Sequence, residues 1–183
     1  MNEGLIPKRY AKALFKVALE RGDAKALYAT MDTLARSFAA NPQLQETVAN
    51  PFLADDKKTA LLMTAAGTTA AGSPTYADFL KLMAENRRLP MMRSAALAYL
   101  DIYRQANNIY PVKIVSAEPL GDAERSRLEQ IIGKQLPGAT VEYDFSVDPS
   151  LIGGFTVSIG SQRLDASVEN ELKQLRLRLL SKI

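Results

Sequence analysis

The chain has 183 residues, of which 47% are hydrophobic and 23% are charged, and its 23 basic and 20 acidic residues leave a net charge of +3. This composition is that of a folded globular protein and excludes wholesale disorder. Cysteine and histidine are both absent, which excludes disulfides, thiolate catalysis, cysteine-type zinc sites and every catalytic triad that needs an imidazole.

The chain shows no signal for a membrane segment. No apolar stretch approaches the roughly 18 residues that a membrane span needs. The first residues also lack the apolar run of a secretion signal. We therefore expect no direct membrane insertion.

The first hundred residues predict a set of helices. Apolar residues recur there at helical spacing, and prolines, glycines and capping residues interrupt the pattern. Six helices are predicted, at about 7–22, 23–41, 42–50, 55–67, 73–86 and 89–107. The segment 67–72 consists of small residues without a pattern, and we interpret it as a loop.

The hydrophobic period changes after about residue 108. Alternating residues predict strands at about 112–117, 141–147 and 155–159, with Leu164 on a returning strand. Helices are predicted at about 122–136 and from Ser167 onward, the last with Val168, Leu172, Leu175 and Leu179 on one side. The predicted class is therefore α+β, with a six-helix bundle at 1–106 and a small α+β domain at 107–183.

The first helix has a broader apolar surface than one core needs. With Tyr10 set at 0° and 100° per residue, the apolar positions run from Ala13 through Val17 and Leu14 to Leu19. They cover an arc of roughly 240°, whereas a surface helix needs an apolar stripe of roughly 100°. The helix is either central in its bundle or has a second apolar face for a partner.

The fifth predicted helix has a similar excess. Leu82 lies apart from the apolar face that carries Phe79 and Met83, and on the side of the polar Asn86. If the first and fifth helices are neighbours, their spare surfaces form a groove for an amphipathic helix. The alternative is that the bundle buries both faces of its central helices.

Other candidate features are weaker. Lys8, Arg9, Lys12 and Lys16 form a basic row, which we interpret as a solvated helix face, so no nucleic-acid partner is predicted. The sequence contains no phosphate-loop lysine pattern, dinucleotide glycine fingerprint or zinc spacing, so no cofactor or metal is predicted.

Paired glycines just before an alternating strand indicate a corner of the chain. The stretch 150–157 (SLIGGFTV), followed by 165–167 (DAS), resembles the C-terminal motif of the delta subunit of F-type ATP synthases, whose mitochondrial counterpart is the oligomycin-sensitivity-conferring protein. The motif residues are Leu151, Gly153, Gly154, Phe155, Asp165 and Ser167. The stretch 10–15 (YAKALF) is similar to the opening helix of that family, and 83–89 (MAENRRL) to its fifth-helix segment, although the family often has glycine at the position of Arg87.

The resemblance implies a non-catalytic stator subunit without a cofactor, peripheral on the cytoplasmic face of the cell membrane and a monomer within its complex. In the family, the first and fifth helices grip the N-terminal helix of an alpha subunit, and the C-terminal domain meets the C-terminal region of the b-subunit stalk. Such a subunit stops the catalytic head from turning with the rotor. The residues that this implies for the alpha-subunit groove are Tyr10, Ala13, Leu14, Val17, Phe79, Leu82, Met83 and Asn86.

Three other functions remain compatible with the residues alone. One is a two-domain adaptor that binds an amphipathic helix of another assembly. A second is a histidine-free enzyme that uses carboxylates or Lys113, and a third is weak RNA binding through the basic first helix.

Overall fold

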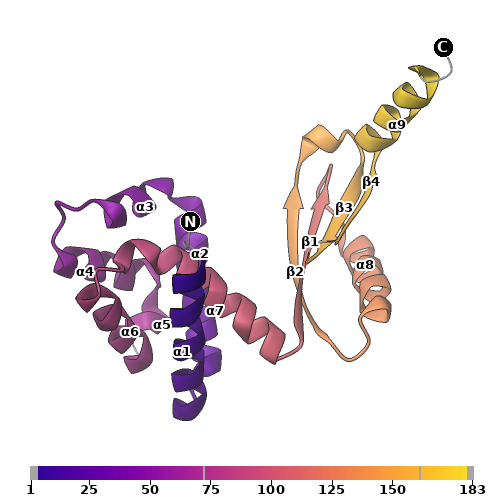
Figure 1. The fold of residues 1–183 in the computed structure, drawn as a ribbon. Coiled ribbons are helices and arrows are strands. Elements are labelled where there is room, and N and C mark those ends of the chain that lie inside the picture. Colours follow the sequence, from indigo (N-terminus) through magenta and orange to yellow (C-terminus); the bar gives the residue numbers. More distant parts are fainter. Residues whose placement is uncertain (1–3, 72, 161, 181–183) are drawn as a thin grey trace. The chain divides into compact units, whose positions relative to one another are not determined.

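The chain divides into two compact units, Met1–Ala106 and Asn107–Ile183. The computed structural model describes residues 4–71, 73–160 and 162–180. The first unit is helical and the second holds a sheet (Figure 1). The chain is therefore of the predicted α+β class. None of the helices within the described ranges is both long enough and apolar enough to span a bilayer.

Helices of the first unit lie at the positions that the apolar spacing predicts. They are α1 (Leu5–Arg21), α2 (Ala24–Ala40), α3 (Pro42–Ala49), α4 (Asp55–Ala65), α6 (Pro74–Glu85) and α7 (Met92–Ala106). A 3₁₀ turn at Leu89–Met91 precedes α7 and begins where the sixth predicted helix does.

The predicted loop at 67–72 is wrong, because Thr68–Ala71 form a further helical turn, α5. Gly72 lies outside the described residues. The Ala70 side chain is fully buried, so this turn contributes to the core. A four-residue helix is too short to show a helical period in sequence, and the prediction of six helices is one short within the part of the unit that the structure describes.

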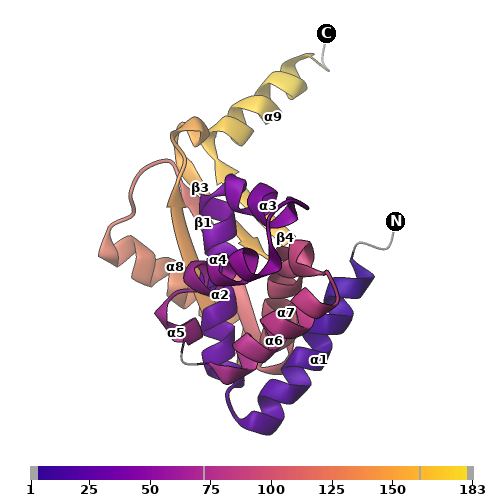
Figure 2. The ribbon, with the colours of Figure 1, turned by 90° about the vertical axis from the view of Figure 1, so that its left-hand side faces the viewer.

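The core of the first unit surrounds α7, which packs against α1 and α2 (Figure 2). Two fully buried tyrosines anchor the surrounding helices. The hydroxyl of Tyr76 donates to the carbonyl of Leu62 at 3.1 Å, and that of Tyr99 donates to the carbonyl of Ala24 at 3.1 Å. Because each hydroxyl has an acceptor, both rings enter the core without an unpaired polar group.

The second unit is built on a four-stranded sheet. Its strands are β1 (Ile109–Ser116), β2 (Thr140–Val147), β3 (Gly154–Ile159) and β4 (Gln162–Ser167), in the order β2-β1-β3-β4. β1 pairs in parallel with β2, and β3 is antiparallel to both β1 and β4. The helix α8 (Asp122–Gln135) connects the two parallel strands, as a parallel pair requires a crossover.

One face of this sheet forms a small core with α8. Val112 and Ile114 of β1, Val157 of β3 and Ile132 of α8 are its buried residues. The hydroxyl of Tyr143 on β2 donates to the carbonyl of Glu129 at 3.1 Å and so ties α8 to the edge strand. The last helix, α9 (Val168–Leu180), follows β4 directly and extends away from the sheet (Figure 1), with no buried residue.

Candidate partner-binding surfaces

The helices α1 and α6 are neighbours in the first unit. The Arg21 guanidinium, at the end of α1, donates to the carboxylate of Asp78 at 2.8 Å and to the hydroxyl of Thr75 at 3.1 Å. Thr75 and Asp78 lie in the first turns of α6. The sequence predicted a shared binding surface only if these two helices are neighbours. The structure meets this condition.

The broad apolar arc of α1 is only partly used by the core. On the helical wheel, Leu14 and Phe15 mark the two edges of the face that points into the core, and this face spans about 100°. Both side chains are buried. On one flank of this arc Ala13 is exposed, Val17 is 37% exposed and Tyr10 is half-buried. The excess predicted from the sequence is therefore present as accessible surface.

The helix α6 contributes the facing part of this surface. Its Leu82 side chain is 44% exposed, and Asn86 just beyond the helix is exposed. We call Tyr10, Ala13, Val17, Leu82 and Asn86 the α1–α6 surface. The alternative in which the bundle encloses both faces of these helices does not hold for Val17 or Leu82.

Three predicted groove residues lie in the core instead. Leu14, Phe79 and Met83 are 5%, 4% and 0% exposed. The helix faces that carry them pack inward, so these side chains support the α1–α6 surface from below and offer almost no area of their own. The helical period showed that these residues belong to the apolar face of their helix. It could not show which of them the core buries, because that depends on the helices packed against them.

The motif residues of the second unit gather at one corner, where β4 passes into α9. Leu151 is buried, and the carbonyl of Gly153 accepts the N–H of Val168 at 3.0 Å. Gly154 pairs with Ser167 across the β3–β4 ladder. A Cβ atom at Gly154 would lie 2.2 Å from the carbonyl oxygen of Ala166, so the two strands approach too closely for any side chain there.

Asp165 and Ser167 complete this corner by fixing the start of α9. The Oδ1 atom of Asp165 accepts the backbone N–H of Ser167 at 3.1 Å and its hydroxyl at 2.6 Å. The Ser167 hydroxyl oxygen accepts the N–H of Asn170 at 3.3 Å, as an N-capping serine does. The hydrogen bonds from Ser167 lower the pKa of Asp165 below its usual value. Leu151, Gly153, Gly154, Asp165 and Ser167 therefore fix the direction of α9, whereas Phe155 lines an apolar pocket beside α8.

A second accessible apolar surface lies beside α8, and the sequence did not single it out. It is an open pocket of about 300 Å³ between α8 and strands β3 and β4. Ile131 of α8 and Leu164 of β4 line it and are 51% and 63% exposed, and Phe155 and Val157 of β3 also line it. The available signals were the predicted positions of Leu164 on a returning strand and of Phe155 and Val157 on the strand before it. The pocket exists because a single helix covers only part of this face.

The apolar side of α9 is also largely exposed beyond its first turn. Val168, Leu172, Leu175 and Leu179, which share a predicted face, are 37%, 52%, 53% and 68% exposed. Leu177 and Leu180 are exposed as well. Contiguous apolar patches of this kind mark surfaces for another protein rather than for water.

The remaining candidate features stay at the surface. Lys8, Arg9, Lys12 and Lys16 are all exposed. Within residues 4–71, 73–160 and 162–180, no three acidic side chains come together to hold a metal ion. The Lys113 side chain is exposed on β1.

Comparison with known proteins gives one consistent result. A family model described as ATP synthase delta (OSCP) subunit matches residues 6–179. A Bacteroides thetaiotaomicron protein named ATP synthase subunit delta is 35% identical over 182 residues, covering 100% of this chain and 97% of that protein. A protein of the same name from Azorhizobium caulinodans is 36% identical over 171 residues, covering 92% and 89%.

A solved structure has the same fold. A chain in the cryo-EM structure of the Toxoplasma gondii mitochondrial ATP synthase hexamer matches with a TM-score of 0.72 and 22% identity, covering 95% of this chain and 97% of that one. The match therefore includes both units.

Proposed function

Because the chain belongs to the ATP synthase delta (OSCP) subunit family, we propose that its α1–α6 surface binds the N-terminal helix of an alpha subunit and that residues 107–183 contact the C-terminal region of a b subunit. The chain is a non-catalytic component of the peripheral stalk of F-type ATP synthase. Its work is mechanical: it holds the catalytic head to the stalk while the rotor turns.

The exposure of Leu82 carries the first half of the proposal. Leu82 on α6 is 44% exposed, and Val17 on the neighbouring helix α1 is 37% exposed, so both leave apolar area that another amphipathic helix can cover. The charged side chains of α1 that flank this surface are exposed and suit the polar rim of such an interface. Burial of this area stabilises a complex without any chemistry.

The second half rests on the apolar surfaces of the second unit. The pocket beside α8 and the leucines of α9 are both accessible. A stalk helix that packed there would complete the cover of the sheet, and its apolar face would be matched to Ile131 and Leu164. The chain would then act as a monomeric link between two partners, with its complex held at the cytoplasmic face of the cell membrane.

Substitution of Leu82 by aspartate tests the alpha-subunit site. We expect Leu82→Asp to weaken binding of an alpha-subunit N-terminal peptide by about 2 kcal/mol or more, because a charge would replace a central apolar anchor. Isothermal titration calorimetry with the full chain measures this loss. The fold should be retained, since Leu82 is outside the core.

Leu19→Asp is a matched control, because Leu19 is 57% exposed on the opposite flank of α1. It should bind the peptide as the wild-type chain does. Unchanged affinity in a folded Leu82→Asp variant would refute the alpha-subunit site, whereas equal losses in both variants would indicate nonspecific apolar binding.

A further inference from the structure

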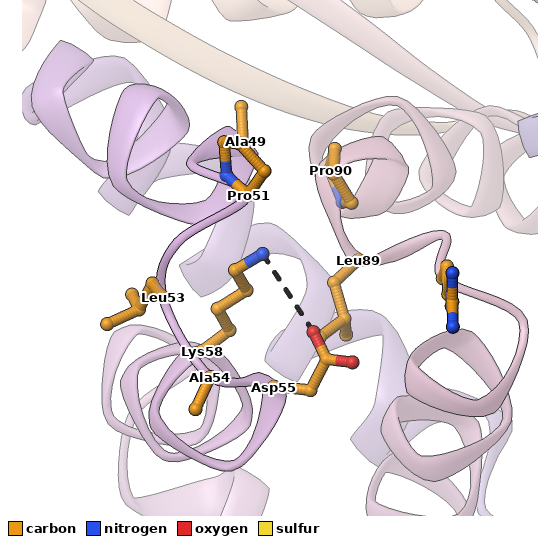
Figure 3. A pocket seen from close by; sticks show the side chains of 9 residues that line it. Ala49, Pro51, Leu53, Ala54, Asp55, Lys58, Leu89 and Pro90 are labelled. Atoms are coloured by element: carbon orange, nitrogen blue, oxygen red, sulfur yellow. Dashed lines mark ion pairs between the residues drawn. The ribbon is translucent and has the colours of Figure 1, made fainter.

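A second pocket, in the first unit, is separate in its residues from the surfaces described above. It is an open pocket with a volume of about 480 Å³, lined by the turn after α3, the beginning of α4 and the segment between α6 and α7. Its wall is partly apolar: Pro51 and Leu53 form one side, and Leu89 and Pro90 the other (Figure 3). Pockets of this size can hold a small molecule.

The ammonium of Lys58 lies in this pocket between apolar walls (Figure 3). The residue is only 6% exposed. Its ammonium forms an ion pair with Asp55, whose Oδ1 atom lies 3.8 Å away, beyond hydrogen-bond distance. Within the described residues the structure gives this ammonium no hydrogen bond, although it has three donors. The Nζ atom is not sealed from solvent, so the ammonium faces the open space of the pocket, where an anionic acceptor can reach its donors.

Arg87 brings a second positive charge to the same pocket. Its backbone has a φ of +55°, at a helix end where glycine is the usual residue. The N–H of Arg87 donates to the carbonyl of Ala84 at 2.8 Å, and that of Arg88 to the carbonyl of Met83 at 2.7 Å. These bonds fix the position from which the Arg87 side chain leaves α6. No ion pair of its guanidinium occurs among the described residues.

The net charge of the pocket lining indicates the charge of its ligand. Lys58 and Arg87 contribute two positive charges and Asp55 one negative charge, so the lining carries a net charge of +1. A monoanion neutralises this lining, whereas a phosphate dianion would leave it negative beside Asp55. The apolar walls favour a ligand that also has an apolar part.

We propose that this pocket binds a small monocarboxylate with a short apolar body. The carboxylate would accept hydrogen bonds from the Lys58 ammonium and the Arg87 guanidinium, which are charge-assisted and therefore strong. The apolar body would lie along Pro51 and Leu89. This site does not depend on the proposed alpha-subunit or b-subunit contacts, because it uses none of their residues.

Titration of the full chain with hexanoate, followed by amide chemical shifts in ¹H–¹⁵N NMR spectra, tests the site. We expect saturable shifts at Leu53 and Leu89. The neutral hexanamide should bind at least about tenfold more weakly, since it lacks the charge that two cations recognise. Inorganic phosphate should also bind more weakly, because it lacks the apolar body.

Variants locate the binding within the pocket. Lys58→Met keeps the length of the side chain and removes its charge, and it should weaken hexanoate binding by about tenfold or more. Lys57→Met is the matched control, since Lys57 is the exposed neighbour on the same helix, and its affinity should be that of the wild type. Arg87→Gly removes the second cation and allows the positive φ, so it should weaken binding without loss of thermal stability.

If Lys58→Met fails to fold, Arg87→Gly provides the decisive measurement. The absence of saturable shifts with hexanoate in the wild-type chain would overturn the proposal. Equal binding of hexanamide would overturn the role of the cations, and tighter binding of phosphate would overturn the assignment of an apolar ligand.

Discussion

At Gly154 a single hydrogen atom in place of a side chain allows two strands to meet. The residue has a φ of +74°, and a Cβ atom there would lie 2.2 Å from the carbonyl oxygen of Ala166. We expect Gly154→Ala to lower the free energy of unfolding of the second unit by about 3 kcal/mol, from the left-handed backbone and the steric overlap together. Chemical denaturation followed by far-UV circular dichroism measures the change.

Gly133 provides the control for this prediction. It lies inside α8, and a Cβ atom there would meet nothing within 4 Å. Gly133→Ala should therefore stabilise the unit by about 0.5–1 kcal/mol, because alanine favours a helix interior. If Gly154→Ala were as stable as the wild type, the close approach of β3 to β4 at this corner would be wrong.

Single residues also mark the limit of what the sequence predicts. The exposure of Leu82 followed from its angle on the helical wheel, because that angle separates it from Phe79 and Met83. The burial of Lys58 had no such signal, since it depends on Leu89 and Pro90, which come from a distant segment. Periodicity describes one helix at a time, whereas a pocket depends on the packing of several.

The start of α9 depends on a charged hydrogen-bond acceptor. Asp165 accepts two hydrogen bonds from Ser167, and these bonds lower the pKa of its carboxyl group. A lowered pKa in the folded state means that the stabilisation is complete above the ordinary value of about 4 and is lost as the pH falls through the folded-state pKa. The attachment of α9 should therefore weaken in acid.

Asp165→Asn tests this pH dependence. Asparagine keeps an acceptor oxygen but loses the charge, so we expect faster amide hydrogen exchange at the start of α9 at pH 7 than in the wild type. The difference between the two chains should shrink as the pH falls through the lowered pKa of the wild-type carboxyl, because that side chain then also becomes neutral. Asp144→Asn is the control, because Asp144 is exposed on β2. A difference for Asp165→Asn that stayed constant from pH 7 to pH 3 would contradict the role of the charge.

Elements with a long, regular pattern were the ones that the sequence predicted well. The alternation at 141–147 became β2, and the helix predicted at about 23–41 became α2. The one-turn α5 was missed because four residues carry no period. The hydrophobic pattern also did not predict how the strands pair. Nothing in the alternation of β1 or β2 indicates that they run parallel, since that depends on the path of α8.

The two units present apolar surfaces of different kinds. In the first unit the surface is the flank of a packed helix pair, whereas in the second it is a sheet face that α8 leaves partly open. A subunit that transmits force gains from two separate attachments, because after one has bound, the second partner is held at a high effective concentration. Each contact can then be modest while the link as a whole persists.

Binding to an assembly that carries both partners tests this linkage. We expect the wild-type chain to bind ATP synthase depleted of this subunit at least about 100-fold more tightly than it binds either partner peptide alone. Leu82→Asp should reduce the affinity to that of the b-subunit contact, and Leu164→Lys, in the pocket beside α8, to that of the alpha-subunit contact. The double variant should not bind. Biolayer interferometry with the immobilised complex gives these values, and wild-type binding no tighter than to the better single peptide would show that the two sites do not act together.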